Sequence, residues 1–576
     1  MHLTALDWAI VALVLFGNLA VGLYVTKRAS ASSASFFLGG RHMPWWLLGT
    51  SMVATTFAAD TPNLVTGLVR TGGVAANWAW WCFLLTGMLT AFVYAKLWRR
   101  LGVTTDNEFY ERRYSGKPAA FLRGFRAVYL GIFFNVLIMG NVTLAAIKYG
   151  AVLFNVSPVM VVVIAGGVTV AFSAAGGLLG VLVTDMVLFV IAMAGAIIAA
   201  LYALDHPSVG GLDALLAHAN VADKLPMVPD MSDPAVYVPL LVIPLAVQWW
   251  ASWYPGSEPG GGGYVAQRML AAKNERHAVA ATVFFNLAHY ALRPWPWIIV
   301  ALASLVVFPD IASLKAALPQ VPENILTDDL AYPAMLTFLP AGLLGLVMAS
   351  IVAAYVSTIS TSLNWGASYV VNDVYVRFMK PDATDKQQVM AGRVVTVLLM
   401  VLAGLFALTL ESANQGFNLL LSVGAGTGLL FILRWFWSRI NAWSEVAAMV
   451  ISFAVSILLD RIDFGLASHE KFVAAVAITT AGWVIVTLLT PKTDAAKLSA
   501  FKAETAAFTE PGVVGSGVRA AAWGVAGVYA LLFGLGQLLY GNLTAAALLL
   551  FVFTLATARV LGAIKRVPVT EEPSAP

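Results

Sequence analysis

The sequence predicts an all-α integral membrane protein with about fifteen transmembrane helices. Hydrophobic residues make up 60% of its 576 residues and charged residues only 11%, far from the composition of soluble domains. Apolar runs long enough to cross roughly 30 Å of hydrocarbon recur along the whole chain. The longest stretches between them, at 205–234, 310–333 and 491–517, are each about thirty residues or shorter, which is too short for a soluble catalytic domain. The lipid bilayer is therefore an expected partner.

Each apolar run corresponds to one predicted helix. The expected spans are 6–26, 44–71, 77–99, 121–153, 158–174, 178–204, 235–255, 277–308, 334–376, 389–410, 413–436, 441–460, 471–490, 518–539 and 542–562. The first run has neither a basic segment before it nor a small-residue cleavage site, so we interpret it as a retained helix rather than a signal peptide. The single cysteine, Cys82, lies inside an apolar run and excludes an intrachain disulfide.

Lysine and arginine gather in every second loop, which predicts the orientation of the chain. These loops follow the odd-numbered helices and include Lys27, Arg28, Arg99, Arg100, Arg268, Lys273, Arg276, Arg377, Lys380, Arg434, Lys492, Lys565 and Arg566. The positive-inside rule places them in the cytoplasm, with the N-terminus outside and the C-terminus inside. Because the basic residues are spread over short loops, the net charge of +4 does not indicate nucleic-acid binding.

The second predicted helix contains a polar interruption. Its apolar run is interrupted by two threonines and then by Asp60, Thr61 and Pro62. Proline lacks an amide donor and clashes with the carbonyl four residues earlier, near Ala58, so backbone groups become free at membrane depth. Such groups are tolerated where they line a cavity or bind a ligand. A simple proline kink satisfied by threonine hydroxyls is the alternative.

The seventh predicted helix is interrupted as well, because Gln248 to Tyr254 runs into a proline- and glycine-rich segment at 255–263. The two interruptions fall in the first helix of two successive groups of five helices. That arrangement is expected of inverted repeats with a binding site at their interface. The alternative is that the glycine run is an ordinary cytoplasmic loop.

Two further helices carry polar groups at membrane depth. Asp185 follows Thr184 inside the sixth helix, and an ionisable group there is a functional candidate; the alternative is a cap at a wet helix end. In the ninth helix, Ser357, Ser360 and Thr361 share one face with Asn364. Hydroxyl oxygens suit a small hard cation, although they also act as contacts between membrane helices.

Other intramembrane polar residues are less specific. Lys148, His289 and Arg293 are each compatible with a gate, a partner for a carboxylate or a side chain that reaches the interface. We interpret the tryptophans at 78, 80, 81, 295 and 297 as interfacial belts. Phosphate loops, nucleophile elbows and His or Cys clusters are absent from the sequence, so we do not expect an enzyme.

Several motifs together resemble the sodium:solute symporter family, whose bacterial members carry galactose, proline, pantothenate or sialic acid. The motifs are Ser35 to Arg41, Gly177-Leu178 with Thr184-Asp185, Gln267-Arg268, Ala353 to Tyr375, and Arg434 to Trp437 with Arg439 to Trp443. The resemblance covers nearly the whole chain. It implies a protein of the bacterial cytoplasmic membrane with a LeuT-like core. The implied division is one extra helix with its loop at 1–43, a first five-helix repeat at 44–204, an extracellular loop at 205–234, a second repeat at 235–436 and four further helices at 437–576.

The same resemblance implies two sites for Na⁺, the coupling ion. The shared sodium site would be formed by the carbonyls of Ala54, Phe57 and Ala354 with the hydroxyls of Ser357 and Thr358. The second sodium site would be formed by Asp185, Ser357, Ser360 and Thr361. Candidate solute contacts by position are Asp60, Thr61, Trp78, Gln248, Trp253 and Asn418.

Three departures from the family pattern leave the solute open. Asp60-Thr61 stands where sugar carriers have a Glu-Gln pair, the segment 255–263 precedes Gln267-Arg268, and Leu188 occupies a position that is often Gln. We therefore expect a secondary active transporter that carries a small polar organic solute with two sodium ions by alternating access. The alternatives are a proton-coupled carrier, in which Asp60, Asp185 or His289 would titrate, and a nutrient sensor that does not transport. The sequence indicates no obligate protein partner.

Overall fold

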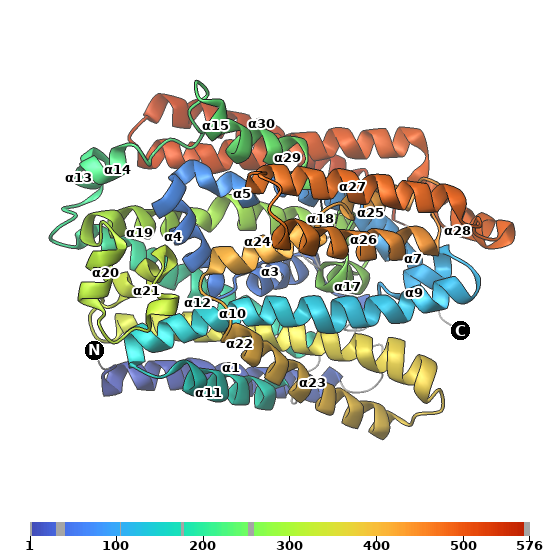
Figure 1. The fold of residues 1–576 in the computed structure, drawn as a ribbon, viewed down its shortest axis with the longest axis horizontal. Helices are drawn as coiled ribbons and strands as arrows, with labels where there is room; N and C mark the ends of the chain where they lie inside the picture. The colour runs from blue at the N-terminus through green and yellow to red at the C-terminus, as the bar shows by residue number, and fades with distance from the viewer. Residues whose placement is uncertain (1–2, 30–40, 104, 174–177, 252–258, 570–576) are drawn as a thin grey trace.

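A computed structural model describes residues 3–29, 41–103, 105–173, 178–251 and 259–569, and within these ranges the secondary structure is helical, without named strands. The helices lie side by side along one axis, with the two chain ends at opposite ends of the bundle (Figure 1). In the described residues, ten helices are long and apolar enough to span a membrane. The expected count of about fifteen is supported only loosely, because the remaining spans are short or interrupted.

The bounds of the main elements follow chain order. The first part contains α1 (Ala5–Ala29), α3 (Trp45–Thr56), α4 (Asp60–Gly72), α5 (Trp78–Trp81), α6 (Leu84–Leu89), α7 (Ala95–Leu101), α8 (Glu108–Arg113), α9 (Gly116–Val128), α10 (Asn135–Tyr149), α11 (Pro158–Ser173) and α12 (Leu178–Asp205). The middle contains α15 (Pro234–Tyr237), α16 (Ile243–Ala246), α17 (Gly263–Ala271), α18 (Glu275–Leu287), α19 (Pro294–Val307), α21 (Ala331–Leu336), α22 (Leu343–Tyr369) and the π-helical η11 (Val370–Met379). The last part contains α23 (Asp385–Ala407), α24 (Ala413–Gly424), α25 (Gly428–Leu433), α26 (Ala442–Arg461), α27 (Ser468–Leu489), α28 (Ala495–Thr509), α29 (Pro511–Leu539) and α30 (Leu543–Lys565).

The second predicted helix is broken where the sequence predicts. Helix α3 ends at Thr56, and α4 begins at Asp60. Phe57 leaves the helical region with φ −83° and ψ 64°. Pro62 lies in the first turn of α4, where its missing amide is tolerated because that amide would have no partner within the helix. A bend by proline alone would keep one continuous helix, so the break in the main chain favours the cavity interpretation over the simple kink.

The seventh helix is interrupted too. Helices α15 and α16 lead into a short 3₁₀ turn at Gln248–Trp250, and the next helix among the described residues, α17, begins at Gly263. Gly260 and Gly261 have φ of +85° and +86°, a conformation that other residues rarely adopt. The Gly260 carbonyl accepts a hydrogen bond of 2.7 Å from the Trp98 indole of α7. This glycine segment is therefore packed into the bundle rather than forming a free loop.

The expected tryptophan belts are wrong. Trp78, Trp80, Trp81, Trp295 and Trp297 are all at most 5% exposed. They lie inside the protein because α5 and α19 pack against α29 and the core; the Trp295 indole, for example, donates to the Leu532 carbonyl at 2.9 Å. A cluster of aromatic residues near a helix end therefore packs the core here rather than facing the headgroups.

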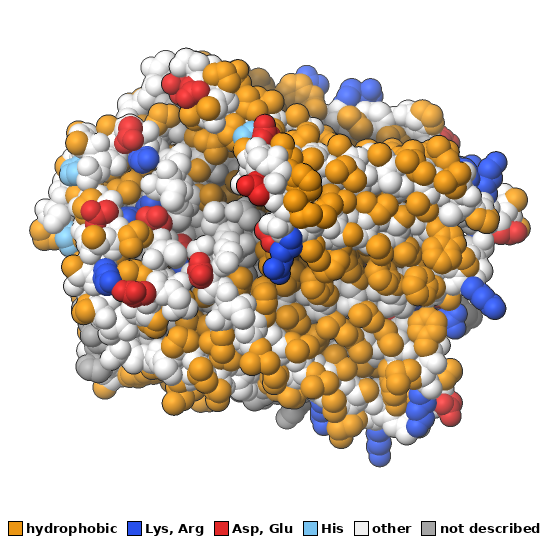
Figure 2. All heavy atoms as spheres, in the orientation of Figure 1, with side chains coloured by type: hydrophobic (Ala, Val, Ile, Leu, Met, Phe, Trp, Pro, Cys, Tyr) orange, Lys and Arg blue, Asp and Glu red, His pale blue; other side chains and the backbone are white. Residues whose placement is uncertain are grey.

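Buried arginines and aromatic rings fill the end of the bundle where the C-terminus lies (Figure 1). The Arg434 guanidinium is 4.6 Å from the Phe109 ring centre and donates to Glu445 at 3.4 Å. Arg113 donates to the carbonyls of Arg434 and Trp437. Figure 2 shows a broad hydrophobic band on the viewed face, with mostly Lys and Arg at this end and both charge signs at the other. The core is thus closed at the basic end by side chains.

Candidate functional site

A buried carboxylate joins three helices at the centre of the bundle. Asp185 of α12 is fully buried. Its two oxygens accept hydrogen bonds from different helices, at 2.6 Å from the Ser51 hydroxyl of α3 and at 2.5 Å from the Ser357 hydroxyl of α22. Asp185 is therefore not a cap at a wet helix end. The family resemblance implies that Asp185 and Ser357 meet. It does not imply Ser51, because a single serine in an apolar helix is a weak signal in the sequence.

A cation of the protein lies beside this carboxylate. The Nε and Nη2 atoms of Arg268, in α17, are each 3.4 Å from the Ser51 hydroxyl. Arg268 is 1% exposed, and its charge acts on Asp185. A buried carboxylate is costly unless an opposite charge or hydrogen bonds compensate it. The glycine-rich break positions α17, so Arg268 reaches the same centre as the hydroxyls of α22.

The remaining hydroxyls on this face of α22 can still form hydrogen bonds or bind an ion. The Ser360 and Thr361 hydroxyls are buried and, among the described residues, have no hydrogen-bond partner in the protein. Hydroxyls that only join helices would be bonded across the interface. Buried hydroxyl oxygens without a protein partner, on the helix face that includes Ser357, instead match the oxygen ligands of a small hard cation. The predicted second set, with Asp185 and Ser357, thus has the chemistry that Na⁺ requires.

The predicted shared set lies where the end of α3 meets α22. The Thr358 hydroxyl donates to the Thr55 carbonyl at 3.0 Å and so joins the break to α22. The Ala54 carbonyl accepts from the Phe57 amide at 3.1 Å, which closes the last turn before the break. Ala354 lies one turn before Thr358 on α22, and Ser357 faces Asp185 in this conformation. The structure therefore brings together the elements of this set, with Ser357 at the Asp185 side.

A cavity of about 80 Å³ adjoins the break. Asp60 and Thr61, two of the candidate solute contacts, line it. The Asn141 side chain of α10 donates to Asp60 at 2.7 Å. The lining residues are Thr55, Thr56, Ala58, Asp60, Thr61, Leu64, Trp80, Ile138, Asn141, Val142, His289, Arg293, Phe417 and Leu420. A lining that combines a few polar groups with apolar and aromatic side chains is typical of a site for a small polar molecule.

Three of the other candidate solute residues lie away from this cavity. The Trp78 indole donates to the Met227 carbonyl at 3.0 Å, and the Gln248 amide donates to the Ala79 carbonyl at 2.5 Å. Asn418 is exposed on α24, although its neighbour Phe417 lines the cavity. Trp253 lies outside the described residues. These four positions stay predictions.

His289 and Arg293 contact the residues of the break. A His289 ring nitrogen is 3.2 Å from the Thr56 hydroxyl, and Arg293 lies 3.4 Å from the other ring nitrogen. The Arg293 guanidinium also stacks on Phe57 at 5.7 Å. The sequence leaves three interpretations open for these residues, and one of them, a side chain that reaches the membrane interface, is wrong. Both side chains are at most 2% exposed. They lie at the cavity, as a gate or a carboxylate partner would.

Lys148 has a different role. Its ammonium lies 2.5 Å from Asp329 and 2.7 Å from the Thr327 hydroxyl, and it is fully buried. Asp329 also accepts from the Ala413 amide at 2.9 Å. Lys148 is thus the partner of a carboxylate, and it ties α10 to the segment before α21 and to α24.

Comparisons with known proteins place this arrangement in a family. Residues 36–452 match the model of the sodium:solute symporter family. A sodium/glucose cotransporter of Vibrio parahaemolyticus is 26% identical over 79% of this chain and 85% of its own length. A sodium/myo-inositol cotransporter 2 of Bos taurus is 27% identical over 80% of this chain and 71% of its own length.

A solved structure shows the same fold. It is a sodium-coupled sialic acid symporter in a substrate-bound outward-open state, with a TM-score of 0.67 and 22% identity over 85% of this chain and 99% of its own. The LeuT-like architecture expected from the resemblance is therefore confirmed. This chain belongs to the sodium:solute symporter family and is a multi-pass, sodium-coupled membrane transporter with Na⁺ as its coupling ion.

Proposed function

We propose that this protein carries a small polar organic solute into the cell together with two sodium ions. The observation that supports two ions is the pair of buried hydroxyls, Ser360 and Thr361, which have no described protein partner and share a face of α22 with Ser357, the residue that donates to Asp185. The solved sialic acid symporter, whose structure revealed a novel Na⁺ site, has the same fold. Ser357 belongs to both proposed sites, so the two ions would influence each other.

Each proposed sodium site joins different helices of the bundle. The first consists of the Ala54, Phe57 and Ala354 carbonyls with the Ser357 and Thr358 hydroxyls, and the second of Asp185, Ser357, Ser360 and Thr361. An ion in the first would join the break after α3 to α22, which Thr358 and Thr55 already connect. Coupling requires that sodium binds one conformation more tightly than the other, because equal affinity would shift no equilibrium.

We place the solute in the cavity beside the break. Asp60, Thr61 and Asn141 offer hydrogen-bond acceptors and donors, while Trp80 offers a flat apolar face. Such a combination suits a polyhydroxylated solute, and the sugar and inositol cotransporters among the relatives agree with that class. The cavity is far smaller than the roughly 300–1,000 Å³ typical of ligand sites. It must therefore widen when the solute enters.

The proposed topology has the N-terminus outside and the C-terminus in the cytoplasm of a bacterium. It is supported by the Lys- and Arg-rich end of the bundle, where the C-terminus lies (Figure 2). The carrier would work alone, without a protein partner and without covalent chemistry.

Ligand-dependent stability tests this function directly. The purified protein is melted in NaCl or in choline chloride with glucose, galactose, myo-inositol, proline or sialic acid. We expect at least one polyhydroxylated solute to raise Tm in NaCl only, because a ligand that binds the native state stabilises it. The same solute should then accumulate in proteoliposomes driven by a sodium gradient. Accumulation driven by a proton gradient without sodium would contradict the proposal, and stabilisation without any flux would favour the sensor.

A further inference from the structure

A large groove lies on the lipid-facing side of the bundle, away from the sodium and solute sites. It has a volume of about 470 Å³, within the range of ligand sites. Its walls come from α18 on one side and from the hairpin of α29 and α30 on the other, with Trp45 and Met88 between them. Only 11% of the apolar stretch of α30 is buried. Hydrocarbon chains of the bilayer therefore have direct access to the groove.

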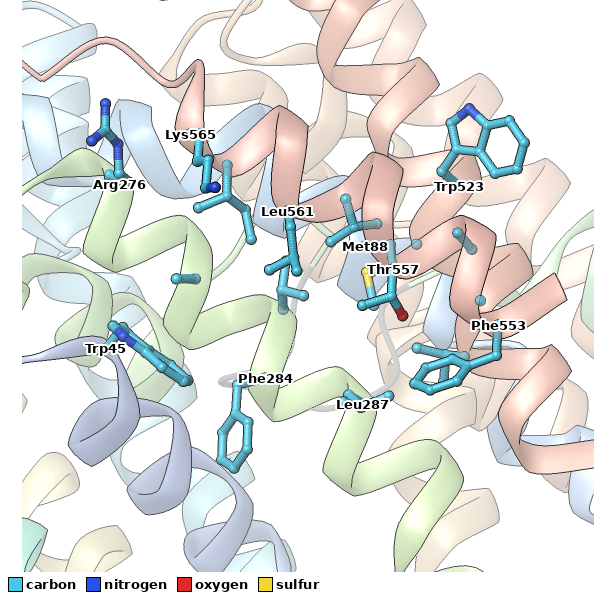
Figure 3. Close-up of a pocket in the computed structure, with 18 of the residues that line it drawn as sticks. Trp45, Met88, Arg276, Phe284, Leu287, Trp523, Phe553, Thr557, Leu561 and Lys565 are labelled. Atoms are coloured by element: carbon cyan, nitrogen blue, oxygen red, sulfur yellow. The ribbon is translucent and has the colours of Figure 1, made fainter. Parts of the chain in front are cut away.

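The groove is polarised along its length. Figure 3 shows Arg276 and Lys565 at one end, and Leu287 and Phe553 at the other. Its lining includes two exposed cations and no carboxylate. The Arg276 guanidinium donates to the Val567 carbonyl at 3.3 Å, which holds it at this end. Two like charges at the mouth of one groove repel each other unless an anion lies between them.

Small residues of α29 and α30 form part of the groove wall. Gly524, Gly527 and Ala556 line it, and a methyl group added at Gly524 would lie 2.7 Å from the Met88 sulfur. Packing at these positions is therefore tight, with no space for larger side chains.

We propose that the groove binds one anionic phospholipid of the cytoplasmic leaflet, with its phosphate between Arg276 and Lys565 and an acyl chain along α18 and α30. Basic pockets between transmembrane helices on the cytoplasmic side recognise anionic headgroups in this way. The leaflet rests on the orientation proposed above, but binding to the groove does not. Phosphatidylcholine carries a choline cation beside its phosphate, and that positive charge offsets the attraction to Arg276 and Lys565, so phosphatidylglycerol should bind better than phosphatidylcholine.

Native mass spectrometry of the delipidated protein, titrated with phosphatidylglycerol or phosphatidylcholine in detergent, tests the site. We expect a tight phosphatidylglycerol adduct that R276Q/K565Q weakens about tenfold, because each cation near a headgroup adds to the attraction. The control K492Q/K502Q removes two exposed lysines outside the groove and should not change the adduct. Thr557→Trp fills the groove and should weaken the adduct while both cations remain.

Equal adducts for wild type and R276Q/K565Q would overturn the proposal, and so would an adduct that Thr557→Trp leaves unchanged. Displacement of the lipid by millimolar inorganic phosphate would show a simple anion site, which also overturns it. The proposal is also overturned if a co-purified membrane peptide occupies the groove and phosphatidylglycerol does not displace it. Equal Tm values for the variants and wild type exclude misfolding. The binding measurement involves neither sodium nor solute, so its failure leaves the transport function untouched.

Discussion

Single residues decide how the proposed sodium sites work, and Ser357 is the most informative of them. Its hydroxyl donates to Asp185, and it belongs to both proposed sodium sites. Ser357→Ala should raise the sodium concentration needed for half-maximal thermal stabilisation by roughly tenfold or more, because a hydrogen bond to a charged group contributes about 1.5–3 kcal/mol. Ser362→Ala is the matched control. That residue is also buried on α22, but it lies off the hydroxyl face. If the two substitutions have equal effects, the hydroxyls of α22 act as contacts between helices and not as sodium ligands.

Lys148 should matter for stability rather than for sodium binding. Lys148→Met leaves the buried Asp329 without its cation, and breaking a buried pair in this way costs about 3–5 kcal/mol. We expect a clear fall in Tm. Lys315→Met removes an exposed pair with Glu323 and should leave Tm nearly unchanged, because solvent and salt screen exposed ion pairs. A Lys148→Met protein as stable as the Lys315→Met protein would show that Asp329 is satisfied without Lys148.

At the scale of elements, the glycine break before α17 should tolerate little change. Gly261 has φ +86°, and a Cβ there would lie 2.6 Å from the Met269 methyl group. Gly261→Ala should therefore destabilise the protein by about 1–3 kcal/mol and weaken sodium binding, because α17 carries Arg268 toward Asp185. Gly512→Ala at the start of α29 meets nothing within 4 Å and should be neutral. Thermal unfolding with and without NaCl measures both effects.

The short helix α8 contributes stability that depends on pH. Burial acts to raise the pKa of Glu111, but hydrogen bonds from Arg377 at 2.9 Å and Arg123 at 2.7 Å outweigh it and hold the pKa below its ordinary value of 4.5. The unfolded chain then takes up a proton first as the pH falls, so this stabilisation is present above pH 4.5 and is lost below it. The Tm difference between wild type and Glu111→Gln should shrink on acidification from pH 7 to pH 4. A difference independent of pH would contradict this account.

The sequence predicts the breaks in these elements better than their contacts. Pro62 and the run of glycines interrupt apolar runs locally, so both breaks can be predicted from short patterns. The proximity of Asn141 to Asp60, and of Arg268 and Ser51 to Asp185, depends on how distant helices pack, and no local pattern encodes it. The tryptophans of α5 and α19 were misassigned for the same reason: apolar composition does not distinguish a lipid-facing ring from one that another helix covers.

At the scale of the whole molecule, the proposed function requires that the solute cavity and the sodium sites change conformation together. The break between α3 and α4 lies at the cavity where we place the solute, and the Thr358 hydroxyl of α22 donates to the Thr55 carbonyl just before this break. Asp185 and Arg268 connect α12 and α17 to the same centre. The end that contains Arg434 and Glu445 is closed by buried side chains and must rearrange if solute leaves through it.

Equilibrium binding of radioactive ²²Na⁺ to the purified protein tests the central claim most directly, since it requires no knowledge of the solute. We predict that wild type binds two sodium ions and that Asp185→Ala, with an unchanged fold, binds one. A wild-type protein that binds a single ion, together with an Asp185→Ala variant that binds it equally well, would contradict the account.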